Sequence, residues 1–126
     1  MADLKVVKVV SGLTKAAKEI NNDNKAKGFY DREFNIGERL MQVVGELGEA
    51  LESDRKGFHY KENLDVTTPS EYNFMTMVKD TMEDELADSI IRLLDMCGYM
   101  NINIDAHINY KLAFNKTRES KHGKNY

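Results

Sequence analysis

The sequence has 126 residues, of which 41% are hydrophobic and 31% charged, and its formal net charge is -3. This length suits one domain with one core, and the charge balance argues against a generic nucleic-acid-binding protein. No apolar run approaches the roughly 20 residues that cross a bilayer, and no secretory signal is recognisable at the N-terminus. The lone Cys97 excludes an internal disulfide and suits a reducing compartment. We therefore expect a cytoplasmic protein with no membrane or nucleic-acid partner.

The spacing of the apolar residues predicts four helices. Their expected ranges, in chain order, are 3–26, from 31 or 35 to 55, 73–99 and 106–117. Asp31 or Asn35 is placed to cap the second helix, Gly57 to end it and Asp105 to cap the fourth. Helices that each bury one apolar stripe predict an all-α, four-helix-bundle-like fold, with the second and third helices antiparallel.

A long connection is expected between the second and third helices. Residues 58–72 lose the helical period and contain the only proline of the chain, Pro69. Irregular segments of this length are uncommon inside a compact domain unless they bind or cover something. We interpret 58–72 as a lid or specificity segment.

Two acidic pairs stand out on the predicted second and third helices. GELGEALE at 45–52 contains Glu46 and Glu49, and EDELADSIIRLLD at 83–95 contains Glu85 and Asp88. Each pair is spaced i, i+3 and lies on the same shoulder of its helix relative to the apolar stripe. If the helices pack stripe to stripe and in register, the four carboxylates converge over the groove between them.

Four clustered carboxylates repel one another unless they share protons or bind cations. An all-oxygen set without histidine or thiolate suits Mg²⁺, or Mn²⁺, and Mg²⁺ usually completes its shell with water and substrate phosphates. The pairs therefore indicate phosphate chemistry, the alternative being two ordinary solvated helix faces. Arg92, one turn after Asp88, is placed either to approach phosphate or to pair with Asp88 or Asp95.

At these residues the sequence resembles the MazG-like, all-α nucleoside triphosphate pyrophosphohydrolases, whose signature is an ExxE pair on one helix and ExxD on a later one. The resemblance covers 24–57, 83–98 and 110–124, more than half of the chain and in the same order. One departure is Gly45, which stands where many relatives carry a further glutamate directly before the first pair. This departure leaves the number of metal ions open.

The resemblance implies Mg²⁺-dependent hydrolysis of a nucleoside triphosphate, including deoxy or non-canonical ones, to the monophosphate and pyrophosphate, as in nucleotide-pool sanitising enzymes. It implies metal ligation by Glu46, Glu49, Glu85 and Asp88. A carboxylate that is not fully engaged with the metal can accept the proton of the attacking water, so Glu49 and Glu46 are the expected catalytic carboxylates, with Glu49 as the general base. The resemblance also implies that Lys111 and Asn115 bind the substrate, and that Tyr30, which lies where relatives place an aromatic residue, stacks on the base. Arg118 and Lys121 are expected to extend the positive edge beside Lys111. Relatives assemble as homodimers or homotetramers, so the same is expected here.

Two other classes of protein fit parts of the pattern. A non-catalytic helical protein-interaction module would use an exposed apolar stripe and leave both acidic pairs in solvent. A dinuclear iron carboxylate bundle would need ExxH motifs, which the sequence lacks.

Overall fold

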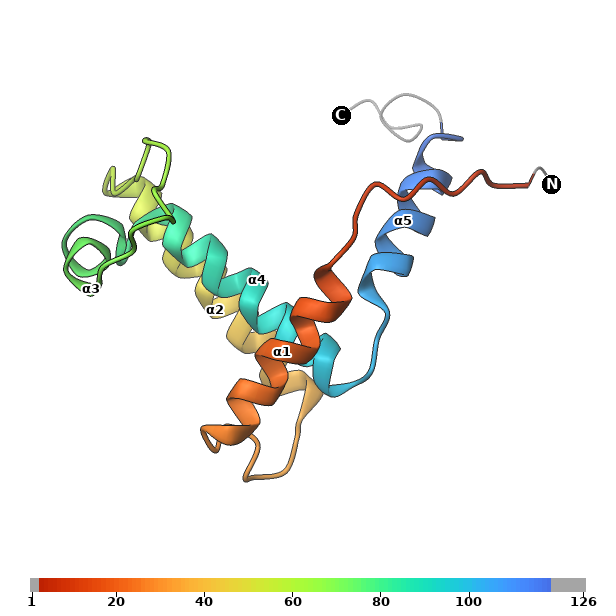
Figure 1. Ribbon diagram of the computed structural model, residues 1–126, viewed down its shortest axis with the longest axis horizontal. Coiled ribbons are helices and arrows are strands. Elements are labelled where there is room, and N and C mark those ends of the chain that lie inside the picture. The colour runs from red at the N-terminus through yellow and green to blue at the C-terminus, as the bar shows by residue number, and fades with distance from the viewer. Residues whose placement is uncertain (1–2, 119–126) are drawn as a thin grey trace. The chain divides into compact units, whose positions relative to one another are not determined.

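The computed structural model describes residues 3–118, and within this range every regular element is a helix. The helices are α1 (Leu13–Ala26), α2 (Ile36–Arg55), α3 (Glu71–Asn73), the π-helix η1 (Phe74–Val78), α4 (Met82–Tyr99) and α5 (Ile104–Asn115) (Figure 1). The all-α class is therefore confirmed. Over the same residues, no helix combines the length and apolar character needed to cross a bilayer.

The chain divides into two compact units. One, called the terminal unit here, consists of Met1–Lys27 and Leu94–Tyr126; the other, called the hairpin unit, is Gly28–Leu93. The single-domain organisation stays a prediction.

The first helix begins at Leu13 and not at residue 3, so this prediction was wrong. The valine-rich segment before it is non-helical and runs beside α5 (Figure 1). Asn109 of α5 accepts from the Val10 N–H and donates to the Val10 carbonyl, both at 2.8 Å. Gly12 then adopts φ +86°, a left-handed conformation that glycine takes at little cost. These tertiary hydrogen bonds satisfy the two backbone groups of Val10 that a helix would otherwise have paired.

Asp105 caps a different helix from the one expected. Its carboxylate accepts from the backbone N–H groups of Leu13 and Thr14, at 3.0 and 3.2 Å, and so satisfies the start of α1. The cap of α5 is instead Asn103, whose side chain accepts from the Ala106 N–H at 3.1 Å. Spacing along the chain could not reveal this exchange, because it depends on which helix ends meet.

The core of the terminal unit forms where α1 meets the last turns of α4. Ala17, Leu94 and Cys97 are buried there, and burial raises the pKa of the Cys97 thiol. A Cβ built on Gly98 would lie 2.2 Å from the Ala17 carbonyl oxygen. Only glycine at position 98 permits this approach of the two backbones.

The second helix has the expected boundaries. Asn35 is its N-cap and accepts from the Glu38 N–H at 2.9 Å. At the other end Gly57 has φ +74°, its N–H donates to the Asp54 carbonyl, and the Phe58 N–H donates to the Ser53 carbonyl. This is the Schellman arrangement that glycine favours at a helix C-terminus.

The predicted third helix, 73–99, is interrupted before α4 begins. The Lys79 N–H closes η1 on the Phe74 carbonyl at 2.8 Å, and Asp80 then turns the chain with φ +66°. Thr81 caps the start of α4, because the Thr81 hydroxyl accepts a hydrogen bond from the Asp84 N–H at 3.3 Å. The Thr81 to Asp84 spacing is that of a capping motif, so the sequence did contain this signal.

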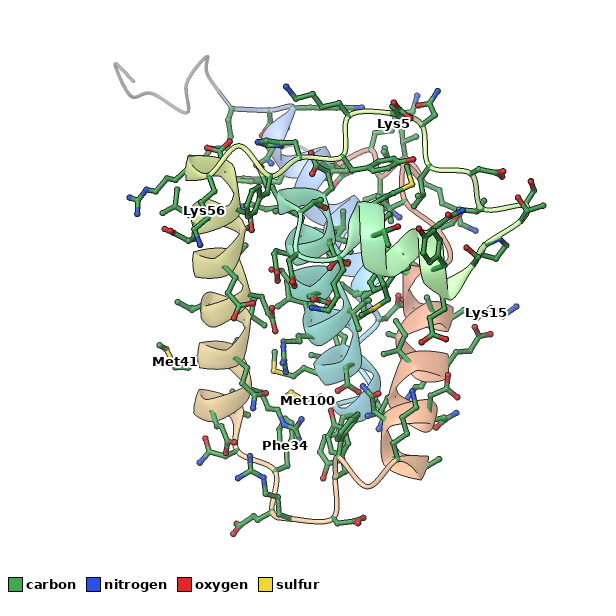
Figure 2. All side chains as sticks on the ribbon, turned by 90° about the vertical axis from the view of Figure 1, so that its left-hand side faces the viewer. Lys5, Lys15, Phe34, Met41, Lys56 and Met100 are labelled. Carbon is green, nitrogen blue, oxygen red and sulfur yellow. The ribbon has the colours of Figure 1, made fainter. Side chains whose placement is uncertain are left out.

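The apolar stripes of α2 and α4 do not pack against each other as expected. Of the predicted α2 stripe only Val43 is buried, at 7% exposure, whereas Leu47 is 47% exposed; on α4 Ile90 is 55% exposed. Figure 2 shows the exposed Met41 pointing away from α4. Because the acidic pairs lie about 100° or more from the stripe centres, turning them toward the partner helix turns the stripes away from it.

Candidate metal centre

In the hairpin unit, α2 and α4 are antiparallel neighbours (Figure 1). Ser53, near the end of α2, donates from Oγ to the Asp80 carbonyl just before α4, at 2.9 Å. Glu46, nearer the middle of α2, accepts at Oε1 from Arg92 Nε further along α4, at 2.7 Å. Later α2 residues thus meet earlier α4 residues, which confirms the antiparallel prediction and supplies the register.

In this register the four predicted acids come together. Glu46, Glu85 and Asp88 each present a carboxylate oxygen, and these oxygens lie within 4.8 Å of one another. Glu49 hydrogen-bonds to Glu85. Glu85 lies deepest, at 6% exposure, whereas Glu49 is exposed at the edge of the cluster. The arrangement offers oxygen ligands of different depth on one side of the α2–α4 pair.

The electrostatics of the cluster favour either a shared proton or a cation. The pKa of Glu85 is raised to about 7. The largest cause is burial, followed by the hydrogen bond with Glu49 and the negative charge of Glu49, and then by the effects of Glu46 and Asp88. Burial also raises the pKa of Asp88, helped by the charge of Asp84 and opposed by that of Arg92. A carboxyl that resists ionisation among other carboxylates gains most from a bound divalent cation, which removes both the repulsion and the need for a proton.

Arg92 takes neither of the ion-pair partners considered from the sequence. It pairs with Glu46, the third carboxylate available to it, and its NH1 group donates to Gln42 Oε1 at 3.3 Å. The Glu46 side chain in this pair is 13% exposed, so the guanidinium neutralises a carboxylate that has limited access to water. Arg92 therefore belongs to the cluster as its internal cation.

A second acidic group shares Glu85 with the first. Asp80, Asp84 and Glu85 also present oxygens within 4.8 Å of one another. Asp84 accepts from the Asp80 N–H at 3.0 Å, and Asp80 pairs with Lys79 at 2.9 Å. Neither Asp80 nor Asp84 was singled out from the sequence. The turn at Asp80 brings its carboxylate close to the first turn of α4, and this turn was not predicted from the sequence.

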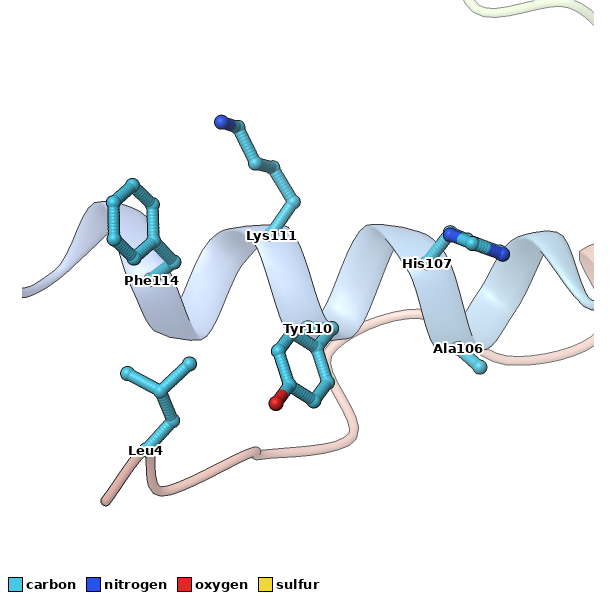
Figure 3. A pocket seen from close by; sticks show the side chains of 6 residues that line it. All are labelled: Leu4, Ala106, His107, Tyr110, Lys111 and Phe114. Atoms are coloured by element: carbon cyan, nitrogen blue, oxygen red, sulfur yellow. The ribbon is translucent and has the colours of Figure 1, made fainter.

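The predicted nucleotide-binding residues of α5 belong to the terminal unit, separate from the hairpin unit of the carboxylates. Lys111 lines an open, mostly apolar groove of about 500 Å³ between residue 4 and α5, and its ammonium lies 5.3 Å from the Phe114 ring centre (Figure 3). The Oδ1 atom of Asn115 is buried and has no hydrogen-bond partner among residues 3–118. Arg118 is exposed with its guanidinium 5.8 Å from the Phe114 ring centre. Lys121 lies outside the described residues.

Tyr30 is part of an aromatic and cationic stack before α2. Its ring stacks with Phe34 at 6.2 Å between centroids, and the Arg39 guanidinium lies 4.2 Å from the centre of the Tyr30 ring. Arg39 is fixed in turn by donating to the Phe29 carbonyl at 2.9 Å. Phe34 and Arg39 were not identified from the sequence, although their spacing from the cap Asn35 places them at the start of α2.

Comparisons of the chain with protein-family models, with curated proteins and with solved structures find no match. The assignment of a function therefore depends on the chemistry of the carboxylate cluster and on the resemblance of its motifs.

Proposed function

We propose that the protein is a Mg²⁺-dependent nucleoside triphosphate pyrophosphohydrolase of the MazG-like type, acting in the cytoplasm. One observation carries the proposal: carboxylate oxygens of Glu46, Glu85 and Asp88 lie within 4.8 Å of one another, and Glu49 is hydrogen-bonded to Glu85. Two helices that lie far apart in sequence contribute these acids from their matching shoulders. Solvated helix faces would not require such a coincidence.

The donor set fits magnesium. All of the ligand atoms are carboxylate oxygens, which Mg²⁺ and Mn²⁺ prefer, and the cluster includes no soft ligand that would favour zinc or copper. Glu46, Glu85 and Asp88 would hold the ion, with Glu49 completing the set. When bound, magnesium supplies charge neutralisation for the triphosphate and lowers the pKa of the attacking water.

Glu49 is the carboxylate best placed to act as general base. It is the most exposed of the four acids while remaining bonded to Glu85, so it can reach both solvent and the buried part of the cluster. In the proposed reaction the water oxygen bonds to the α-phosphorus, its proton passes to Glu49, and the bond from the α-phosphorus to the bridging oxygen breaks. Pyrophosphate leaves with that oxygen, and no covalent enzyme intermediate forms.

Lys111 and Asn115 are proposed to bind phosphate and sugar, with Arg118 and Lys121 extending the positive charge and Tyr30 stacking on the base. The buried Asn115 Oδ1 supports this assignment, because an acceptor without a partner among the described residues is costly unless a ligand satisfies it. A lysine four residues earlier on the same helix supplies a cation on a neighbouring part of the surface.

We also propose that the chain assembles as a homodimer or homotetramer. The exposed apolar residues on α2 and α4 are numerous for one helix pair, and an apolar face of this kind usually marks an interaction surface. Its principal members are Leu40, Val44, Leu47 and Leu51 of α2 with Leu86, Ile90 and Leu93 of α4. Sedimentation equilibrium of the purified chain tests this part of the proposal, which a monomer at micromolar concentration would contradict.

The decisive experiment is pyrophosphate release from a panel of nucleoside and deoxynucleoside triphosphates in the presence of Mg²⁺. The expected result is release with at least one substrate, abolished by EDTA and by Glu46→Gln. Glu19→Gln, an exposed change on α1, is the matched control and should keep full activity. Absence of turnover with every triphosphate would refute the enzyme and favour the alternative, a non-catalytic helical interaction module that uses the same exposed apolar face.

A further inference from the structure

His59 lies between two carboxylates from different helices. Its Nε2 atom is 2.8 Å from Asp54 Oδ1, in the last turn of α2, and its Nδ1 atom is 2.9 Å from Glu83 Oε1, in the first turn of α4. The side chain is 21% exposed, so the ring is largely enclosed by these contacts. All three residues belong to the hairpin unit.

This geometry favours a cationic ring. A neutral imidazole carries one N–H and one lone pair, so it can donate to only one carboxylate and would turn its lone pair toward the other. The imidazolium donates to both. In agreement, the hydrogen bonds that the ring donates to Glu83 and Asp54 raise the pKa of His59 above its ordinary 6.5. The hydrogen bonds that Glu83 accepts from the Tyr60 N–H and from His59 lower the pKa of Glu83 to about 2.

The same contacts attach the start of the 58–72 connection to both helices. The Tyr60 N–H donates to Glu83 Oε2 at 2.9 Å, the Met82 N–H donates to the Phe58 carbonyl at 2.9 Å, and the Phe58 N–H donates to the Ser53 carbonyl at 2.8 Å. Further along the connection, the hydrogen bonds described for residues 61–69 join only residues of the connection itself.

These local bonds run from Thr67 and Thr68 to Asp65. Residues 61–72 are exposed throughout. The polar attachment of the connection to the helix pair is therefore concentrated at 58–60, with His59 at its centre.

We propose that His59 is a pH-dependent clasp that fastens the root of the 58–72 connection to α2 and α4 when protonated and loosens it when neutral. The opening would release the connection at its attachment to the end of the helix pair as the pH rises through the folded-state pKa of His59. The proposal of a clasp does not rest on the proposed function, since none of its residues is among the four predicted metal ligands.

The charged groups around the His59 ring indicate that His59 is the cation whose titration opens the clasp. Asp54 from α2 and Glu83 from α4 are the groups that face it. The neighbouring cations of α2, Arg55 and Lys56, are directed at Glu52, at 3.9 and 3.7 Å. The direction of the pH dependence follows from the raised pKa of His59. The clasp is fully closed below pH 6.5, the ordinary pKa of histidine, and is lost as the pH rises through the pKa of His59 in the folded protein.

The test is an NMR titration of the full chain labelled with ¹⁵N. We expect the His59 ring to titrate above pH 6.5 and the Tyr60 amide resonance to move with the same midpoint, with increased backbone mobility of 58–62 on the alkaline side. Glu83→Gln should lower the His59 midpoint. His107→Gln, which removes a histidine of α5, distinguishes its ring signal from those of the other two histidines of the chain and should leave the Tyr60 titration unchanged.

Two results would overturn the proposal. One is a His59 midpoint at or below 6.5 in the wild-type chain, which needs no variant to be folded. The other is a Tyr60 amide whose resonance and mobility do not follow the titration of His59. If both residues titrate together in the wild type and His59→Gln abolishes the alkaline change, the clasp is established.

Discussion

Replacing Glu85 by glutamine tests whether the carboxylate cluster is under electrostatic strain without metal. Glutamine keeps the shape of the side chain and can donate hydrogen bonds to the neighbouring Glu49 and Glu46, but it cannot carry the negative charge that burial and these neighbours oppose. In the absence of metal we therefore expect Glu85→Gln to stabilise the protein at alkaline pH.

The magnitude follows from the pKa of Glu85. A carboxyl that ionises near 4.5 in the unfolded chain and at about 7 in the fold favours folding in its protonated form. Its contribution is complete below pH 4.5 and is lost as the pH rises through 7. Since one pKa unit corresponds to about 1.4 kcal/mol, the wild-type protein loses at most about 3 kcal/mol from this group by pH 8. Glu85→Gln should recover a similar amount.

The assay is urea unfolding followed by circular dichroism at pH 4, 6 and 8, with and without Mg²⁺. Without metal, the advantage of Glu85→Gln should be small at pH 4 and largest at pH 8. Magnesium should stabilise the wild type at pH 8, by about 2.7 kcal/mol when its concentration is 100 times the dissociation constant, and should stabilise the variant much less. Calorimetry near pH 7 in two buffers of different ionisation enthalpy should detect proton release on Mg²⁺ binding to the wild type.

The control is Glu19→Gln, which removes an exposed carboxylate of α1 and should change neither the pH dependence nor the response to magnesium. A Glu85→Gln protein that is less stable than the wild type at pH 8 without metal would refute the reasoning, because Glu85 would then be a favourable anion. Equal stabilisation of both proteins by Mg²⁺ would place the metal elsewhere.

Three further changes test other contacts. Gly98→Ala should destabilise the chain by about 3 kcal/mol in urea unfolding, because its Cβ would meet the Ala17 carbonyl oxygen at 2.2 Å; an unchanged midpoint would contradict that close approach. Arg92→Gln should tighten Mg²⁺ binding several-fold in calorimetry, because it frees Glu46 from its ion pair, and weaker binding would argue against competition between guanidinium and metal. Asp105→Ala should lower the urea midpoint at pH 7 and not at pH 2, because hydrogen bonds to the start of α1 outweigh burial and lower the pKa of Asp105; equal effects at both pH values would contradict the role of its charge.

Local signals in the sequence were sufficient for several features of this protein. Asn35 and Gly57 mark the ends of α2, because a cap and a left-handed glycine act on hydrogen bonds within one helix turn. The i, i+3 spacing of the acids placed each pair on one shoulder of its helix, since the angle around a helix axis depends only on position along the chain. The all-α class follows from the same periodicity.

Other features depended on contacts between segments far apart in sequence. Residues 3–10 are non-helical, with Asn109 bound to the Val10 backbone, and Asp105 caps α1 because the first turns of α1 and α5 meet. The exposure of the apolar stripes likewise depends on which face α2 turns toward α4.

Periodicity determines the direction in which a side chain leaves its helix, but it contains no information on how far one helix is displaced along another. The sequence by itself therefore identified Glu46, Glu49, Glu85 and Asp88 as candidates. Only the tertiary structure decided that the antiparallel register of α2 and α4 places Glu46, Glu85 and Asp88 oxygens within 4.8 Å and Glu49 within hydrogen-bonding reach of Glu85.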